Sequence, residues 1–266
     1  MILIDASPLA EGFWALAVLV AASLPVALAP RHGLDRPDAF RASLAMLAGG
    51  WLGGTILPWL EWGVPGSAGD LLTAGKSSLG GLVGGMLGLA LHARMRRNRT
   101  FLREADLMVT GLGLAYAIGR LGCFCHGCSF GATTALPWAV TYPAGTEAHA
   151  AQVAQGLILA NASASLPVHP VQLYSAAAGL AIFLALLRPI AGPPGGRLAL
   201  AASLFGLERL LTAGLRGDFP PLAGPLSWPQ LAGLALMFAG GALSWSLRQR
   251  NPDASSIAPA ALRATD

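Results

Sequence analysis

Seven apolar stretches constrain the fold of this chain more than any other feature. Most of them approach the roughly 20 residues that a helix needs to cross the core of a bilayer. Backbone amides cannot stay unpaired in lipid, and the stretches show no alternating pattern, so they must be helices rather than strands. The sequence therefore predicts an all-α, polytopic membrane protein with seven transmembrane helices. The stretches are residues 12–29, 42–60, 78–92, 107–124, 171–187, 198–215 and 229–247.

Composition and chain organisation agree with a membrane setting. Only 11% of the residues are charged and 54% are hydrophobic, whereas a soluble domain carries about a quarter of charged residues. Asp5 and Glu11 precede the first stretch, where a secretory signal would carry positive charge, so we expect this helix to be retained. We expect one membrane domain over residues 1–250, followed by a polar cytoplasmic tail over residues 251–266.

The positive charges predict the orientation of the chain. Thirteen of the seventeen Lys and Arg residues lie in alternate loops or in the C-terminal tail, and such loops face the cytoplasm. The N-terminus is therefore expected outside and the C-terminus inside. The basic pI of about 9.4 then records topology, and no nucleic-acid partner is expected.

One longer soluble segment separates the fourth and fifth stretches. It covers about residues 125–170, and its lack of Lys and Arg is in keeping with an external location. Its sequence "AHAAQVAQGLILANA", residues 148–162, predicts a short amphipathic helix.

Cationic side chains inside or beside the apolar stretches are the first candidates for function. Arg120 lies thirteen residues into the fourth stretch, roughly 20 Å from its inner end, and Arg209 lies similarly in the sixth. With Arg216 and Lys76 they reach the level of the outer headgroups. A guanidinium group can bind two oxygens of one phosphate at once, so a phospholipid headgroup is the expected anion. Further polar candidates at this level are His169, Gln172 and Tyr174.

Two acidic residues beside these arginines have a simpler interpretation. Glu208 precedes Arg209, and Asp218 follows Arg216 by two residues. We interpret both carboxylates as neutralising an arginine and holding helices together.

The segment "GRLGCFCHGCSFG", residues 119–131, raises three alternatives for its cysteines. A metal site is not expected, because structural zinc sites usually draw ligands from two separated pairs. Cys125 and Cys128 have the CxxC spacing of thiol exchange enzymes, although the chain has no further relay pair. A structural disulfide or buried thiols remain the third alternative. No cofactor is expected.

Glycines repeat every four residues in the segment that contains the third stretch. Gly80, Gly84 and Gly88 share one face of the predicted helix. Small residues let membrane helices approach closely, so we favour tight packing over direct contact with a ligand.

Five segments in order resemble the prolipoprotein diacylglyceryl transferase family. They lie in the middle of the chain, and the cysteine-containing one matches the branch whose signature reads GRxGCFxxGC. The resemblance implies a bacterial inner-membrane enzyme, with its site towards the outer leaflet, that moves the diacylglyceryl group of phosphatidylglycerol to the lipobox cysteine of a precursor protein and releases glycerol phosphate. The segments are "GKSSLGGLVGG", "GRLGCFCHGCSFG", "LPWAVTYP", "HPVQLYS" and "ERLLTAGLRGD".

The resemblance also implies roles for individual residues. Arg120 and Arg209 would hold the headgroup phosphate. Gly122 and Gly131 would shape the turn of the signature. Gln172 and Tyr174 would line the cleft; Arg216, Lys76 and His169 complete the set expected to bind substrate.

Several positions depart from the family pattern. The usual histidine of the glycine-rich segment is Leu79, and Cys123 and Cys128 replace an asparagine and a glutamate. His126 is then our candidate for the base that activates the thiol. Two other functions stay open: a membrane thiol-disulfide oxidoreductase using Cys125 and Cys128, and a non-catalytic lipid-binding homologue. Two further residues depart from the family pattern: Ser175 replaces an acidic residue after the tyrosine, and Ala213 replaces a glutamate four residues after Arg209.

Overall fold

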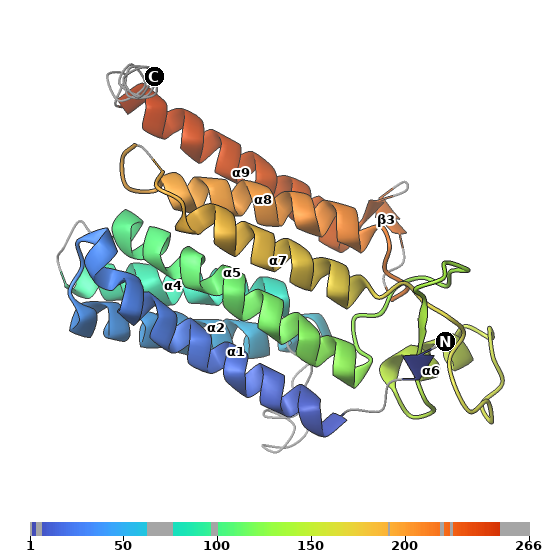
Figure 1. Ribbon diagram of the computed structural model, residues 1–266. Helices are drawn as coiled ribbons and strands as arrows, with labels where there is room; N and C mark the ends of the chain where they lie inside the picture. The colour runs from blue at the N-terminus through green and yellow to red at the C-terminus, as the bar shows by residue number, and fades with distance from the viewer. Residues whose placement is uncertain are drawn as a thin grey trace, which may run out of the picture. The chain divides into compact units, whose positions relative to one another are not determined.

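The apolar stretches all form helices in the computed structural model, which describes residues 2–3, 7–62, 77–96, 101–190, 192–218, 221–223 and 226–250. The predicted all-α class is confirmed, and the tail over residues 251–266 lies outside the described residues. Within these ranges eight α-helices occur (Figure 1). They are α1 (Ser7–Leu28), α2 (Arg36–Trp62), α4 (Ser78–Met95), α5 (Phe101–His126), α6 (Glu147–Ala154), α7 (Val171–Leu187), α8 (Gly196–Ala213) and α9 (Trp228–Arg250).

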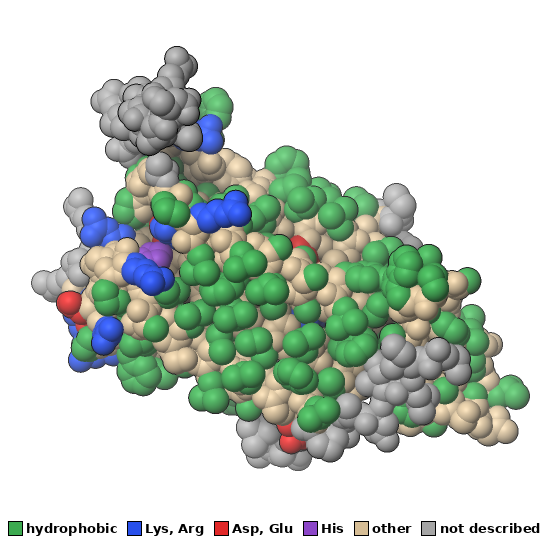
Figure 2. Space-filling model, in the orientation of Figure 1, with side chains coloured by type: hydrophobic (Ala, Val, Ile, Leu, Met, Phe, Trp, Pro, Cys, Tyr) green, Lys and Arg blue, Asp and Glu red, His purple; other side chains and the backbone are tan. Residues whose placement is uncertain are grey.

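Three of the described segments are long and apolar enough to cross a membrane. They are Leu9–His32, Phe101–His126 and Trp228–Arg250, and α7 is a shorter apolar helix. Hydrophobic side chains cover much of the face shown in Figure 2, as expected for a surface in contact with lipid. The full set of seven spans and the orientation of the termini stay predictions.

The chain packs as two compact units. Unit 1 contains Met1–Leu19 and Leu112–Asp266, and unit 2 contains Val20–Gly111. The boundary between the units falls within α1 and within α5.

In unit 2, α2 and α4 run antiparallel with their backbones in contact. A Cβ atom on Gly49 would lie 2.3 Å from the carbonyl oxygen of Gly84, and one on Gly53 would lie 2.2 Å from that of Gly80. Any side chain at these positions would push the helices apart. The predicted tight packing of the glycine-rich face is confirmed.

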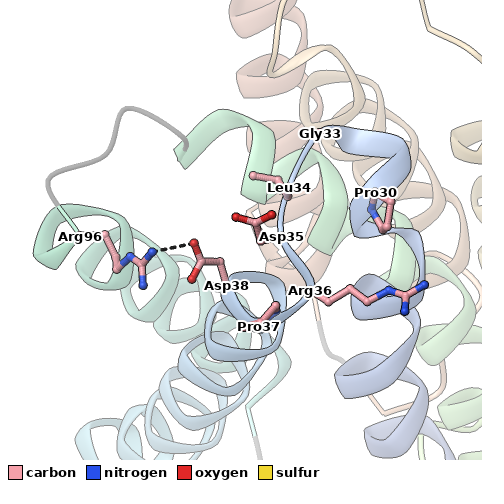
Figure 3. A pocket seen from close by; sticks show the side chains of 8 residues that line it. All are labelled: Pro30, Gly33, Leu34, Asp35, Arg36, Pro37, Asp38 and Arg96. Carbon is pink, nitrogen blue, oxygen red and sulfur yellow. Dashed lines mark hydrogen bonds and ion pairs between the residues drawn. The ribbon is translucent and has the colours of Figure 1, made fainter.

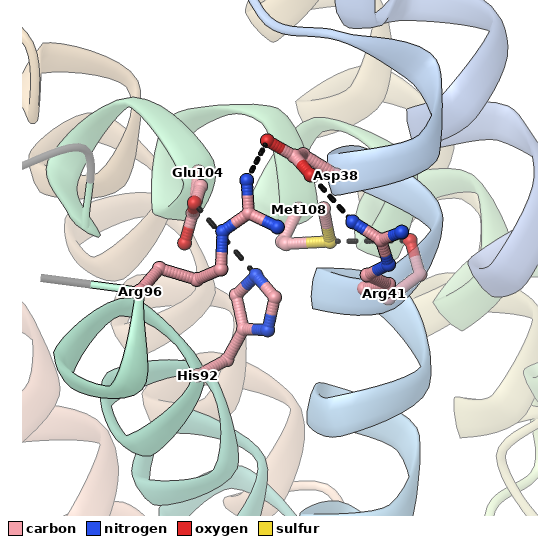
Figure 4. A network of polar contacts seen from close by, with 7 residues as sticks. Asp38, Arg41, His92, Arg96, Glu104 and Met108 are labelled. Carbon is pink, nitrogen blue, oxygen red and sulfur yellow. Dashed lines mark hydrogen bonds and ion pairs between the residues drawn. The ribbon is translucent and has the colours of Figure 1, made fainter. Parts of the chain in front are cut away.

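Unit 2 also contains a polar network at one end of these helices (Figure 4). Asp38 accepts hydrogen bonds from Arg41 at 3.0 Å and from Arg96 at 2.6 Å. Nε2 of His92 lies 4.0 Å from Oε1 of Glu104. A shallow hollow beside this network (Figure 3) contains no residue of the predicted site; its lining is Pro30, Gly33, Leu34, Asp35, Arg36, Pro37, Asp38 and Arg96.

In unit 1, α7, α8 and α9 lie side by side (Figure 1), and α7 packs antiparallel to the second half of α5. Gly179 of α7 approaches Tyr116 of α5, while further along α7 Phe183 approaches Gly113. The connection between α7 and α8 is closed by Arg197, whose Nε donates to the carbonyl of Leu186 at 3.0 Å. The end of α5, the start of α7 and the end of α8 therefore meet at the opposite end of this unit.

The segment between α5 and α7 has its own small core. Strand β2 (Val140–Thr141) pairs in parallel with β1 (Ile2–Leu3), and α6 begins after Thr146, whose hydroxyl accepts from the amide of His149. The predicted amphipathic helix is present but shorter than expected, because it ends before Gly156, which has φ +70°. The core residues are Phe130, Val140, Tyr142, Ala148 and Val168. Strands β3 (Pro221–Ala223) and β4 (Leu226–Ser227) form a second antiparallel pair.

Candidate functional site

The signature segment forms the end of α5 and a tight turn. Gly127 and Ser129 have φ values of +79° and +56°, and the amide of Gly131 donates to the carbonyl of His169 at 3.2 Å. A Cβ atom on Gly131 would lie 2.5 Å from Cβ of His169. Only glycine fits this close approach, which agrees with the expected role of Gly131 in shaping the turn.

Gly122 was expected in the turn of the signature segment, but it lies elsewhere. It lies inside α5, and a Cβ atom there would lie 2.6 Å from Nε1 of Trp14 in α1. The prediction that Gly122 shapes the turn is therefore wrong. Its missing side chain makes room for the indole of Trp14 instead.

Three of the predicted cations come together in unit 1. The guanidinium carbon of Arg120 lies 4.8 Å from the ring centroid of Tyr116. Arg209 lies within electrostatic range of Arg120 and Arg216, whose like charges act on it. Lys76 lies outside the described residues. A cluster of partly buried guanidinium groups repels itself, and an anion placed among the groups would relieve that repulsion.

Arg216 forms an ion pair with Asp218 just after the end of α8. Its Nε donates to Oδ1 of Asp218 at 2.7 Å, and a second bond joins Nη2 to Oδ2. Asp218 thus neutralises an arginine, as expected. The bidentate pair uses donors of Arg216 that a phosphate would otherwise take.

Glu208 was expected to neutralise an arginine, but the hydrogen bonds of its carboxylate in the structure come from hydroxyl groups. Its carboxylate is 6% exposed, and its Oε1 accepts hydrogen bonds from Ser175 at 2.6 Å, Tyr116 at 3.0 Å and Thr212 at 3.1 Å. The carboxylate therefore joins α5, α7 and α8. Tyr116 was not among the residues predicted from the sequence, although its position four residues before Arg120 places both side chains on one helix face.

Gln172, in the first turn of α7, forms a hydrogen bond with the signature turn. The side chain is 1% exposed, and its Nε2 donates to the carbonyl of Cys128 at 2.8 Å and to the hydroxyl of Tyr142 at 3.2 Å. Burial raises the pKa of Tyr142, so this hydroxyl stays protonated at neutral pH. Within the described chain, Oε1 of Gln172 has no hydrogen-bond partner.

His169 and Tyr174 lie at the start of α7. Their ring centroids are 6.3 Å apart in an edge-to-face arrangement, and the hydroxyl of Tyr174 accepts from Nε1 of the exposed Trp138 at 2.7 Å. Nδ1 of His169 is buried, with no hydrogen-bond partner among the residues that the structure describes. Both predicted residues therefore belong to the end of unit 1 where the signature turn lies.

All three cysteines are free thiols. The Cys128 thiol donates to the carbonyl of Cys123 at 3.8 Å. A hydrogen bond with Cys123, and then burial, raise the pKa of Cys128. Thiol exchange requires a thiolate, so this geometry does not favour Cys128 as an attacking group. Over the described ranges, no group of three or more His, Cys, Asp or Glu side chains is arranged to hold a metal ion.

His126 is the last residue of α5. Its ring centroid lies 5.3 Å from that of Trp14, with a tilt of 44°. It follows Arg120 by six residues, which is about 9 Å along the axis and on a different face of the helix. The structure thus brings His126 to the aromatic contact with α1 and not to the guanidinium of Arg120.

Comparisons with known proteins cover most of the chain. The family model "Prolipoprotein diacylglyceryl transferase" matches residues 12–246. The phosphatidylglycerol–prolipoprotein diacylglyceryl transferase 2 of Clostridium perfringens is 27% identical over 232 residues, covering 85% of each chain. A transferase of the same name from Clostridium tetani is 27% identical over 232 residues, covering 85% of this chain and 87% of the relative. One from Thermosynechococcus vestitus is 33% identical over 172 residues, covering 63% and 58%.

Proposed function

Because the chain belongs to the prolipoprotein diacylglyceryl transferase family, we propose that it transfers the diacylglyceryl group of phosphatidylglycerol to the thiol of a lipobox cysteine. The relatives are named for phosphatidylglycerol and for prolipoproteins. The products would be a thioether-linked precursor and glycerol phosphate. We place the reaction in the outer leaflet of the bacterial inner membrane, with the chain crossing that membrane several times.

The cluster of Arg120, Arg209 and Arg216 is the observation that carries this proposal. As the bond between the diacylglyceryl carbon and the phosphate oxygen breaks, negative charge grows on the leaving glycerol phosphate. Guanidinium groups already in place stabilise that charge without reorganising. We assign this task to Arg120 and Arg209, the two arginines that the family resemblance places on the headgroup phosphate, while Arg216 binds Asp218 in bidentate fashion.

Other residues have supporting roles in the proposal. Tyr174 and His169 would contact the headgroup at the start of α7, and Lys76 would add a cation from the glycine-rich segment. Gln172 and Gly131 would hold the turn that follows Arg120. The acceptor thiol must lose a proton before it attacks.

We propose His126 as the base that takes the proton of the acceptor thiol. Its half-buried position at the end of α5 gives access from the membrane surface. A His126→Gln variant with an unchanged pH profile would exclude this role.

The activity test uses the purified protein in detergent micelles with labelled phosphatidylglycerol and a lipobox peptide. We expect glycerol phosphate and lipidated peptide from the wild type, and no turnover from Arg120→Ala or Arg209→Ala. Arg41→Ala is the matched control, since Arg41 is exposed and lies in unit 2. The proposal is wrong if the wild type gives no product under conditions in which the C. perfringens relative is active.

The same assay separates the two alternative functions. Loss of turnover on Cys125→Ser would favour thiol-disulfide chemistry. Binding of phosphatidylglycerol without any product would favour a non-catalytic lipid-binding protein.

A further inference from the structure

We propose that Tyr116 positions Arg120 for the phosphate and that Glu208 fixes Tyr116 in turn. The inference rests on the proposed function, in which Arg120 binds the phosphate of phosphatidylglycerol. It adds Tyr116 and Glu208 as positioning residues, neither of which needs to touch the lipid.

The ring of Tyr116 is held on several sides. A Cβ atom on Gly179 would lie 2.8 Å from its Cδ1, so α7 is in close contact with the ring. Phe205 of α8 meets the ring edge to face, with centroids 5.3 Å apart. The hydroxyl donates to Glu208 at 3.0 Å. These contacts fix the orientation of the ring, and the guanidinium of Arg120 lies over it at 4.8 Å.

The geometry holds Arg120 while leaving most of its hydrogen-bond donors for a ligand. The cation is attracted by the face of the Tyr116 ring, and of the five N–H donors of a guanidinium only those that reach Tyr116 are used in this contact. Glu208 acts on Arg120 electrostatically, but its Oε1 already accepts from three hydroxyl groups. Arg216, in contrast, directs its donors to Asp218. Arg120 is therefore the better placed of the two to bind phosphate oxygens.

Binding of dioctanoyl phosphatidylglycerol in detergent micelles, measured by calorimetry, tests the role of the ring. We expect Tyr116→Leu to weaken binding about 5- to 30-fold, the range of a desolvated cation–aromatic contact. Tyr116→Phe keeps the ring but loses the hydrogen bond to Glu208, so its loss of affinity should be smaller than that of Tyr116→Leu and larger than that of the control. Phe238→Leu is the matched control, because Phe238 is 69% exposed on α9.

A double-mutant cycle with Arg120→Gln separates positioning from a general loss of structure. In the Arg120→Gln background, Tyr116→Leu should cause no further loss of affinity. An equal loss in both backgrounds would overturn the positioning role while leaving the phosphate assignment intact. Unchanged affinity in Arg120→Gln itself would instead overturn the phosphate assignment. If Tyr116→Leu does not fold, Gly179→Ala, whose new methyl group displaces the ring of Tyr116, replaces it in the same cycle, with the same two outcomes.

Discussion

Two adjacent glycines on α9 provide a direct test of how the helices of unit 1 pack. A Cβ atom on Gly240 would lie 2.6 Å from the carbonyl oxygen of Ala199 and 2.7 Å from the amide nitrogen of Ser203, both in α8. A Cβ atom on Gly241 would have nothing within 4 Å. We therefore compare Gly240→Ala with Gly241→Ala, which differ only in the helix face that receives the methyl group.

The expected difference follows from the contacts on α8. Both substitutions replace glycine by alanine within a helix, so the gain of about 1 kcal/mol in helix propensity is common to both and cancels. The clash at Gly240 involves backbone atoms, which no side-chain rotation can relieve, and overpacking of this kind costs about 1–3 kcal/mol. Gly240→Ala should be less stable than Gly241→Ala by that amount.

Unfolding by sodium dodecyl sulfate in mixed micelles, followed by tryptophan fluorescence, measures this difference. A gap of 1.4 kcal/mol corresponds to about a tenfold change in the folding equilibrium. Gly206→Ala should behave like Gly240→Ala, since its Cβ would lie 2.5 Å from the amide nitrogen of Met237. Equal stability of the two α9 variants would show that α8 and α9 are not packed as described.

Two further predictions concern the signature end of unit 1. Gly179→Ala should weaken phosphatidylglycerol binding in the same calorimetric titration, because the new methyl group displaces the ring of Tyr116; affinity equal to that of Gly241→Ala would contradict this. The raised pKa of Cys128 means that it forms less thiolate than a free thiol does, so in a Cys125→Ser variant N-ethylmaleimide should label it more slowly than free cysteine at both pH 7.5 and pH 9. Mass spectrometry locates the label, and rapid labelling at pH 7.5 would refute the assignment.

The sequence predicted well those features that depend only on hydropathy and on position along a helix. Helices are required wherever an apolar stretch must satisfy its own backbone in lipid, and each of the seven stretches forms one. Rise per residue along a helix also led us to expect Arg120 and Arg209 at one level of the chain, and the two lie within electrostatic range of each other. Arg216 joins them because it follows the end of α8 by three residues, at the same end of unit 1.

Rotation about the helix axis was not predictable in the same way. α7 is apolar nearly all round, so no periodic pattern tells which face meets α5. The contact of Gly179 with Tyr116 and the hydrogen bond of Ser175 to Glu208 depend on that rotation. The same reason explains Gly122, whose contact with Trp14 depends on which face of α5 meets α1.

The parallel pairing of β1 with β2 has a consequence for biosynthesis. Ile2 pairs with Val140 and Leu3 with Thr141, so β1 leaves the ribosome before its partner and pairs with it only after α1, α2, α4 and α5 have been made. A nascent chain that stops before residue 140 leaves these N-terminal backbone groups without their partner strand. Closing the pair is thus a late event in synthesis, and it ties the start of the chain to the segment that follows the signature turn.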